Sequence, residues 1–332
     1  MARPYGVRPL VVPSERVLVV DEELAGIALA DFLERHLHDR HRLDLRRLVA
    51  AGSVRVNGVE CLHSKRLRAG DVVQLPADAT QRRRCAAREL PPVLHESPTC
   101  LVVDKPAGLP TVADRSGTDP GLHGVLPALR PDADLRIVHR LDRDTSGCLI
   151  LGKGLAAARH FDVLFRGGGV EKSYVALVQG VPVRDSFEID AWLGPDPRRP
   201  GKVVSSASER RGFRDAHTHV EVRQRFPAHA LVGLRPATGR GHQLRVHLSS
   251  IGHPIVGDAD YGGQPLLLSE LKNGFKLRRG AAERPLLQRM FLHAERIVFR
   301  DVDDTPVAVE APLPEDLATA LQKLASFEGR RR

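Results

Sequence analysis

The sequence has few cysteines and no long apolar run. Four cysteines occur among 332 residues and none belongs to a C-x-x-C pair, which argues against a disulfide framework and a structural zinc site. The longest apolar stretches fall far short of the ~18 residues that a membrane-spanning helix needs. The start, MARPYGVRPLVVPSER, lacks the continuous apolar core of a signal peptide. We therefore expect a cytoplasmic protein with no membrane segment.

Acidic residues are outnumbered by basic ones. The chain has 41 Asp and Glu against 50 Lys and Arg, a formal net charge of +9. Most of the positive charge is arginine, whose planar fork suits phosphate, so the composition modestly favours an RNA or DNA partner. Hydrophobic residues make up 42% of the chain, which is enough for a core and excludes a disordered chain. The length exceeds the ~150 residues of a typical domain and predicts two compact units.

The first third of the chain predicts two helices followed by a small β element. Apolar residues at helical spacing predict helices over 28–37 and 43–52, and Gly52 is placed to end the second. In SVRVNG, Val54 and Val56 alternate with an arginine that we expect on the solvent side. The Asn-Gly pair after them predicts a tight turn with positive φ, and the short strand DVVQL follows.

This arrangement, LRRLVAAGSVRVNGVECLHSKRLRAGDVVQL, resembles the small RNA-binding domain named after ribosomal protein S-four. The resemblance covers roughly residues 17–75. It implies that one basic face contacts RNA phosphates while the periodic apolar residues stay inside. The alternative is an ordinary solvated charged face. The candidate RNA-binding residues are Arg46, Arg47, Arg55, Lys65 and Arg66.

The boundaries follow from a change in pattern. Residues 77–92 lack apolar periodicity and end in a proline pair, so we expect an extension over 1–16, the small domain over 17–76, a linker over 77–92 and a larger unit over 93–332. In the larger unit the strand-like segments TCLVVDK, CLILGK, SYVALVQG, HTHVEVRQRF and HALVGLRP accompany the amphipathic helix GLAAARHFDVLFR. This mixture predicts an α+β fold, and Pro314 opens a final helix.

The segment VHRLDRDTSGCLILGK carries the strongest chemical signal. Asp142 lies between Arg140 and Arg143, just before a Thr-Ser-Gly turn that leads into an apolar strand. A turn supported by a strand is where catalytic groups often sit, and the flanking arginines favour the ionised carboxylate and attract phosphate. Taken alone, a surface cluster of Asp and Arg is the commoner explanation.

Five segments in order resemble the RluA-type family of RNA pseudouridine synthases, over nearly all of residues 92–314. They are VVDKPAGLPTV, HRLD-x-x-TSG around Asp142, EKSYVALVQG, ATGRGHQLRVHLSSIGHPIVGDADYGG and FLHAERIVF. The resemblance implies a catalytic domain centred on a mixed, largely antiparallel sheet, with the cleft across that sheet. It also implies an isomerase that detaches uracil from its ribose in RNA, rotates it and rejoins it through carbon five, with no cofactor.

The resemblance assigns the catalytic residues Asp142, Tyr174 and Arg245. Asp142 acts near the sugar, either trapping the anomeric carbon as an acylal or abstracting the neighbouring sugar proton, and both routes stay open. Arg245 is the fixed cation that helps hold this carboxylate ionised. Tyr174 stacks on the uracil or assists removal of the carbon-five proton; without the motifs it would be an ordinary strand tyrosine.

The candidate substrate-binding residues are Arg140, His139, Arg240 and His242. Arg140 corresponds to the arginine that enters the RNA stack when the target base is flipped out. His139, His242 and His247 are interpreted as hydrogen-bonding scaffold or RNA contacts. His242 and His247 miss the spacing of a helical zinc pair and no carboxylate lies between them, so we expect no metal.

Two segments depart from the family pattern. The stretch 262–289 is long and basic, and we expect an RNA clamp beside the cleft rather than a folded part of the core, with a solvated loop as the alternative. The run 114–134, rich in Gly, Pro and Asp, reads as a mobile loop.

The resemblance favours large-subunit ribosomal RNA as the substrate, with transfer RNA as the alternative, and we expect the synthase to be a monomer. The rival hypotheses are a non-catalytic RNA-binding or ribosome-assembly factor and a metal-dependent RNA hydrolase.

Overall fold

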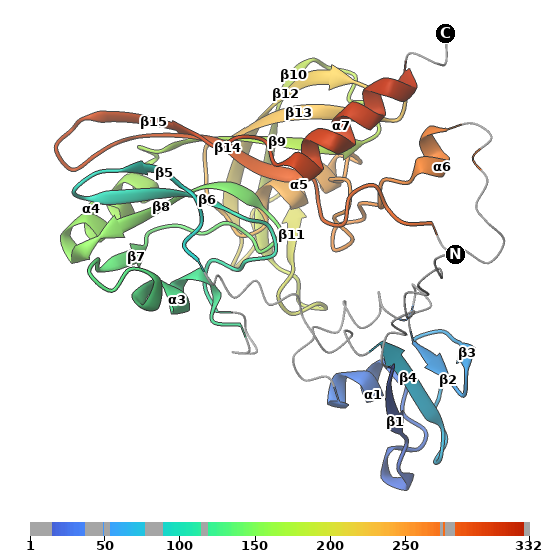
Figure 1. The fold of residues 1–332 in the computed structure, drawn as a ribbon. Coiled ribbons are helices and arrows are strands. Elements are labelled where there is room, and N and C mark those ends of the chain that lie inside the picture. The colour runs from blue at the N-terminus through green and yellow to red at the C-terminus, as the bar shows by residue number, and fades with distance from the viewer. Residues whose placement is uncertain are drawn as a thin grey trace, which may run out of the picture. The chain divides into compact units, whose positions relative to one another are not determined.

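The computed structural model divides the chain into two compact units, Met1–Arg84 and Cys85–Arg332 (Figure 1). The structure describes residues 15–36, 49, 54–76, 89–113, 119–272, 275 and 283–328. The division falls inside the expected linker. The second predicted helix, over 43–52, lies outside the described residues apart from Val49, and so do Arg46 and Arg47.

The described residues of the first unit form a four-stranded antiparallel sheet and the helix α1. The strand order is β1-β4-β2-β3, with β1 at Glu15–Val19, β2 at Arg55–Val56, β3 at Val59–Glu60 and β4 at Val72–Pro76. The 3-10 turn η1 (Glu22–Leu24) precedes α1 (Leu29–His36), which confirms the first predicted helix. Strand β1 was not predicted, because the short segment ERVLV carries two charges and leaves two valines exposed.

The predicted valine alternation and tight turn are confirmed in this unit. Val54 and Val56 are buried whereas Arg55 is exposed. Asn57 and Gly58 have φ values of 54° and 77°, the left-handed region in which a type I′ turn places both central residues. The Asn57 side chain holds the turn, since its Oδ1 accepts a hydrogen bond from the amide of Val72 at 2.8 Å. The turn therefore fixes the register of the small sheet.

The second unit is built on one eleven-stranded sheet, which confirms the predicted α+β class with a mixed, largely antiparallel sheet. The main strand order is β11-β10-β12-β13-β9-β14-β8-β6-β5, with β15 paired to β14 and β7 to β8. Among the described strands only β14 and β8 pair in parallel, through His293 with Ser146 and Ala294 with Gly147. The strands are β5 (Val93–Glu96), β6 (Cys100–Lys105), β7 (Leu135–Ile137), β8 (Ser146–Lys153), β9 (Glu171–Gln179), β10 (Ser186–Pro195), β11 (Val203–Ser206), β12 (Arg214–Arg225), β13 (His229–Pro236), β14 (Leu292–Arg300) and β15 (Pro306–Glu310).

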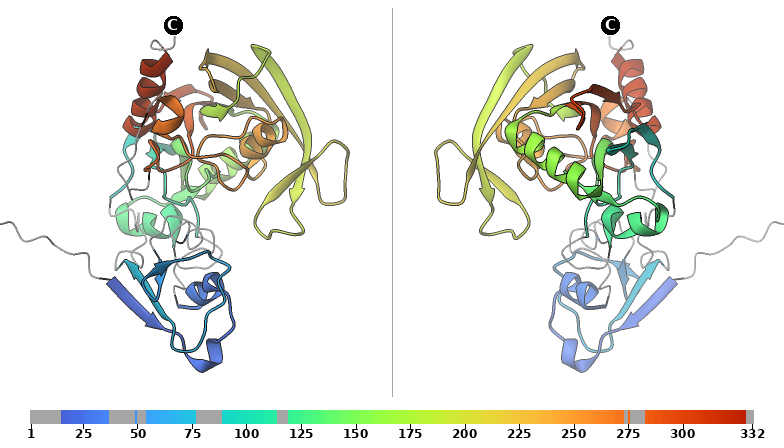
Figure 2. Two further views of the ribbon diagram at one scale, coloured as in Figure 1. Left: turned by 90° about the vertical axis from the view of Figure 1, so that its right-hand side faces the viewer. Right: turned by 90° about the vertical axis from the view of Figure 1, so that its left-hand side faces the viewer.

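Helices cover parts of this sheet, and α4 and α7 were predicted. In Figure 2, β10, β11 and β12 (yellow-green) lie on one side of the unit and α7 (red) on the other. Helix α4 ends at Gly167 and is capped by Gly168, whose φ of 76° suits the left-handed conformation that glycine adopts without strain. The helices are α3 (Gly121–Leu129), α4 (Gly154–Gly167), α5 (Gln243–Ser250), α6 (Leu268–Leu271) and α7 (Glu315–Glu328).

The structure corrects two expectations about loops. The run 114–134, expected as a mobile loop, contains helix α3, which buries Leu122 and Leu126. The basic stretch 262–289, expected outside the core, contributes Leu266 and Leu287 to the largest cluster of buried apolar side chains. In both cases a few buried leucines among glycine, proline or charged residues supply enough buried area to anchor the segment.

The basic stretch is also tied to the final helix. Arg289 pairs bidentately with Asp316 of α7, with Nε to Oδ2 at 2.7 Å and Nη2 to Oδ1 at 2.9 Å. Lys276, Arg278 and Arg279, three basic residues of the stretch expected to form the RNA clamp, lie outside the described residues. No helix in the described part of the chain is both long and apolar enough to cross a membrane.

Candidate active site

The loop that carries Asp142 is held rigidly between β7 and β8. The hydroxyl of Thr111 donates a hydrogen bond to the carbonyl of Leu141 at 2.8 Å and accepts one from the Leu141 amide at 3.1 Å. The amide of Thr145 donates to the carbonyl of Asp142 at 3.1 Å, so the loop turns directly into β8. This confirms the expected strand-supported turn.

A buried lysine stabilises the same loop through hydrogen bonds to backbone carbonyls. Lys105 is 0% exposed, and its ammonium donates to the carbonyls of Leu109 at 2.8 Å and Arg143 at 3.2 Å. Three carbonyl acceptors, the third belonging to Pro106, offset the cost of burying this charge. Lys105 belongs to the DKP motif, and residue patterns alone did not assign it this supporting role.

The glycine of the Thr-Ser-Gly turn is required by close backbone contact. Gly147 has a φ of 113°, and a β-carbon there would lie 2.2 Å from the carbonyl oxygen of Ala294 on β14. Only glycine therefore lets β14 approach β8 at this point. The parallel pairing that joins the two parts of the sheet depends on this contact.

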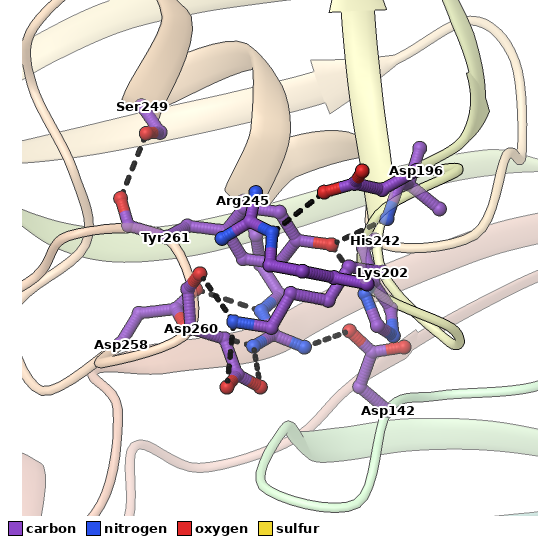
Figure 3. A network of polar contacts seen from close by, with 11 residues as sticks. Asp142, Asp196, Lys202, His242, Arg245, Ser249, Asp258, Asp260 and Tyr261 are labelled. Carbon is purple, nitrogen blue, oxygen red and sulfur yellow. Dashed lines mark hydrogen bonds and ion pairs between the residues drawn. The ribbon is translucent and has the colours of Figure 1, made fainter.

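Arg245 lies at the centre of a network of carboxylates (Figure 3). It projects from α5 and is bound bidentately by Asp258, with Nε to Oδ2 at 2.7 Å and Nη2 to Oδ1 at 2.8 Å. Its Nη2 also lies 3.2 Å from Oδ2 of Asp260, and its Nη1 lies 3.3 Å from Oδ2 of Asp142. The predicted pairing of Asp142 with Arg245 is therefore present, although the strongest partner of the arginine is Asp258.

The electrostatics of this network favour the charged forms of Arg245 and Asp260. Burial opposes the charge on Arg245, but its hydrogen bonds with Asp258 and the nearby carboxylates raise its pKa. Burial likewise acts to raise the pKa of Asp260, yet the charges of Lys202 and Arg245 lower it overall. Nζ of Lys202 lies 3.3 Å from Oδ1 of Asp260. The guanidinium also lies over the ring of Tyr261, 4.8 Å from its centroid.

Residue patterns did not identify four members of this network: Lys202, Asp258, Asp260 and Tyr261. A usable signal was present, because three of them lie in GDADYGG, the end of the motif segment that also contains Arg245. Lys202 carried no local signal, since it lies in the connection between β10 and β11, far along the chain from its partners.

Tyr174 lies on β9 with its side chain half-buried and packed against two clusters of core residues. Burial, together with the negative charge of Asp142, raises the pKa of its phenol. The phenol therefore keeps its proton in neutral solution. A protonated flat ring suits stacking on a base better than it suits accepting a proton.

The candidate residues of the larger unit line one cleft of about 1440 Å³. Its walls come from the loop before β8 and from β9, β13 and α5, which agrees with the expected cleft across the sheet. All seven line it: Asp142, Tyr174, Arg245, Arg140, His139, Arg240 and His242.

Three of the substrate-binding candidates also have partners within the protein. The Nε2 of His139 accepts a hydrogen bond from the Ile150 amide at 2.9 Å, and burial lowers its pKa to about 3. Arg240 donates from Nε to the carbonyl of Asp215 at 2.9 Å. The Nδ1 of His242 lies 2.7 Å from Oη of Tyr261. Arg140 is exposed at the cleft.

The basic residues of the first unit do not share one environment. Arg55 and Arg66 are exposed and Lys65 is half-buried. Arg66 donates to the carbonyl of Gly26 at 2.9 Å, so it also has a structural partner. Within the described ranges, no group of three or more His, Cys, Asp or Glu side chains could hold a metal ion.

Comparisons with known proteins agree on one family. Residues 99–250 match the family model described as RNA pseudouridylate synthase. Two relatives named ribosomal large subunit pseudouridine synthase C are each 33% identical to this chain. The alignment with the protein from Vibrio vulnificus (strain CMCP6) covers 93% of this chain and 96% of that protein, and the alignment with the protein from Escherichia coli (strain K12) covers 94% of this chain and 97% of that protein. The solved structure of human RNA pseudouridylate synthase domain containing 4 covers 70% of this chain and 92% of its own, with a TM-score of 0.58 and 28% identity.

Proposed function

Since the chain belongs to the RNA pseudouridine synthase family, we propose that it converts specific uridines of large-subunit ribosomal RNA to pseudouridine, with Asp142 as the reacting carboxylate. The observation that carries the proposal is the position of Asp142, 3.3 Å from the Arg245 guanidinium in a cleft that Tyr174 also lines. The relatives named for large-subunit RNA, 33% identical over nearly the whole chain, support the substrate.

The chemistry asks for a carboxylate that reaches the sugar. The side chain of Asp142 is 29% exposed, so it faces the cleft while its loop is fixed by Thr111 and Lys105. It attacks the anomeric carbon or removes the neighbouring sugar proton, and the detached uracil then rejoins through carbon five. The arrangement serves either route, and neither needs a cofactor.

Two further residues accommodate the flipped nucleotide, one by stacking on its base and the other by filling the gap that it leaves in the RNA. Tyr174 supplies a flat, protonated ring at the cleft on which the uracil stacks while it is free to rotate. The exposed Arg140, two residues before Asp142, fills the gap that a flipped nucleotide leaves in the RNA stack. His139 supports this loop through its bond to the Ile150 amide.

The first unit serves as the S-four-like RNA-binding domain in this proposal. Its helix, its Asn57-Gly58 turn and its small sheet agree with the resemblance, and Arg55 and Arg66 are exposed on it. The unit would add phosphate contacts outside the cleft and so increase affinity for folded RNA.

The test replaces Asp142 and measures pseudouridine directly. Parent protein and Asp142→Asn are incubated with transcribed large-subunit ribosomal RNA and, separately, with transfer RNA, and pseudouridine is mapped by chemical modification and primer extension. Asp132→Asn, an exposed aspartate in the same part of the chain, is the matched control. We expect modification of ribosomal RNA by the parent and the control, and none by Asp142→Asn, while RNA binding is retained.

Other outcomes decide between the rival hypotheses. Turnover by Asp142→Asn within tenfold of the parent would remove the catalytic assignment. An inactive parent that still binds ribosomal RNA would favour a non-catalytic assembly factor, and activity abolished by EDTA would favour a metal-dependent reaction. Modification of transfer RNA alone would replace the proposed substrate but keep the reaction.

A further inference from the structure

Lys172 lies in the active-site cleft and has no part in the chemistry above. It precedes Tyr174 by two residues on β9, so both side chains lie on the same face of the strand, and both line the cleft. The last pairing of β9 with β13 joins Tyr174 to Leu234, so Lys172 lies beyond the paired part of that edge. It faces the connection that follows β13, because a β-carbon placed on Gly239 would lie 3.9 Å from its Nζ.

The ammonium of Lys172 is half-buried and unpaired. Among the residues that the structure describes, no carboxylate pairs with it and no acceptor takes a hydrogen bond from it. Burial lowers its pKa, and its charge in turn lowers the pKa of the neighbouring His139, so this histidine does not stabilise it. A partly desolvated, unpaired cation is unfavourable in the free protein.

The other buried or half-buried cations of this cleft have partners. Arg245 is bound by Asp258, Asp260 and Asp142, and Arg240 is bound by Asp215. Arg140 also lacks a described partner, but it is exposed and water solvates it. Lys172 is thus a half-buried cation of the cleft that has no anionic partner among the described residues.

We propose that Lys172 binds a phosphodiester of the substrate RNA next to the target uridine and so positions that nucleotide between Asp142 and Tyr174. The uracil and ribose are neutral, whereas each phosphodiester carries a full negative charge, so the phosphate is the substrate group that a bare ammonium selects. The inference rests on the proposed function, because it requires RNA in the cleft. It adds a substrate-positioning residue to that function.

The test combines variants with RNA that lacks single charges. Stem-loops around the mapped uridine carry one neutral methylphosphonate at the linkage before, at or after the target. The proteins are the parent, Lys172→Met, Lys172→Arg and Lys323→Met, which removes the same charge from the exposed surface of α7. Thermal unfolding of each variant verifies its fold, and single-turnover rates are measured against RNA concentration.

We expect one neutral linkage to weaken RNA binding by the parent about tenfold. Lys172→Met should show about the same loss on unmodified RNA and no further loss with that linkage, because the contact is already absent. Lys172→Arg should recover most of the affinity, and Lys323→Met should match the parent. Parent affinity should fall as the pH rises through the lowered pKa of Lys172, whereas that of Lys172→Arg should not.

Three results would overturn the inference. Lys172→Met could bind every RNA with the same affinity as the parent. Alternatively, each neutral linkage could weaken RNA binding by Lys172→Met as much as it weakens binding by the parent. Lys172→Met could also lose maximal rate with unchanged affinity and without recovery by arginine, which would identify proton transfer instead. If Lys172→Met does not fold, the linkage and pH comparison of the parent with Lys172→Arg decides. A parent that forms no pseudouridine at all would reject the proposed function and not this contact alone.

Discussion

At Arg245, one guanidinium is shared by three carboxylates of unequal importance. Asp258 is 1% exposed at its side chain and takes two short hydrogen bonds, whereas Asp142 takes one longer contact. Asp258 therefore orients the arginine, and the remaining nitrogen is directed at Asp142. Lys202 offsets the charge of Asp260, so that this third carboxylate competes less strongly for the arginine.

We expect Asp258→Asn to damage both stability and catalysis. The variant keeps the shape but removes the charge that compensates a buried arginine, which should cost roughly 1.5–3 kcal/mol of stability. The rate should fall because Arg245 loses its fixed orientation. Asp260→Asn is the matched control and should lose less, since its single contact is longer and partly offset by Lys202. Equal unfolding curves and rates for Asp258→Asn and the parent would contradict this reading.

Helix α5 carries Arg245 at the cleft and also carries a buried histidine, His247. His247 is 0% exposed, and neither of its ring nitrogens has a hydrogen-bond partner among the described residues. Burial lowers its pKa from 6.5 to about 4, although the charge of nearby Asp190 acts to raise it and that of His217 to lower it. The helix therefore packs on the sheet with a neutral imidazole.

This burial predicts a pH dependence of stability. Between pH 6.5 and about 4 the unfolded chain protonates at this residue while the folded protein does not. The free energy of unfolding therefore falls as the pH falls through that window, by up to about 1.4 kcal/mol per pH unit from this one group. His247→Leu should remove this share of the slope without loss of stability at neutral pH, because it deletes unpaired buried polar atoms.

Chemical denaturation at a series of pH values measures this effect. His123→Leu, at an exposed position of α3, serves as the control and should leave the slope as in the parent. A pH slope of His247→Leu equal to that of the parent would show that His247 is protonated in the folded protein, or has a partner in it.

The elements differ in how well residue patterns reveal them. Helices α4 and α7 were predictable because their apolar residues keep one face and glycine or proline marks an end. Strands such as β6 were predictable as unbroken apolar runs. Helix α3 and the buried part of 262–289 were not predictable, because only a few leucines in each segment are buried in the core while the surrounding residues are mostly polar, glycine or proline.

The site shows the same contrast. Asp142 and Arg245 are 103 positions apart in the sequence, and nothing local to either residue indicates that they meet. Only the ordered motifs of a known family placed them together. Asp258 and Asp260 lie in the motif segment GDADYGG, but the motif alone does not show that both contact Arg245 of α5.

At the scale of the whole molecule, two units with separate cores imply separable tasks. We expect removal of residues 1–84 to preserve catalysis on a short stem-loop, because the larger unit holds the whole cleft. Affinity for long folded RNA should fall, and the slope of log affinity against log salt should decrease in magnitude by ~0.7 to 0.9 for each lost phosphate contact. Filter binding over a salt series measures both quantities.

The truncated protein should be compared with an Arg55→Ser, Arg66→Ser double variant of the full chain, in which only two exposed charges of the first unit are removed. The RNA affinity and the salt slope of that double variant should lie between those of the parent and those of the truncated protein. Unchanged affinity and salt slope after truncation would show that the first unit does not bind this RNA.

The position of β14 has a consequence for the order in which the protein can be made. It lies between β9 and β8 and joins two groups of strands that were translated long before it. Until residues 292–300 leave the ribosome, β9 presents an open edge, and β8, although paired with β6 and β7, lacks its partner at Ser146 and Gly147, next to the loop of Asp142. A nascent chain arrested before residue 292 should therefore remain sensitive to protease and inactive, so catalytic competence arises only near the end of synthesis.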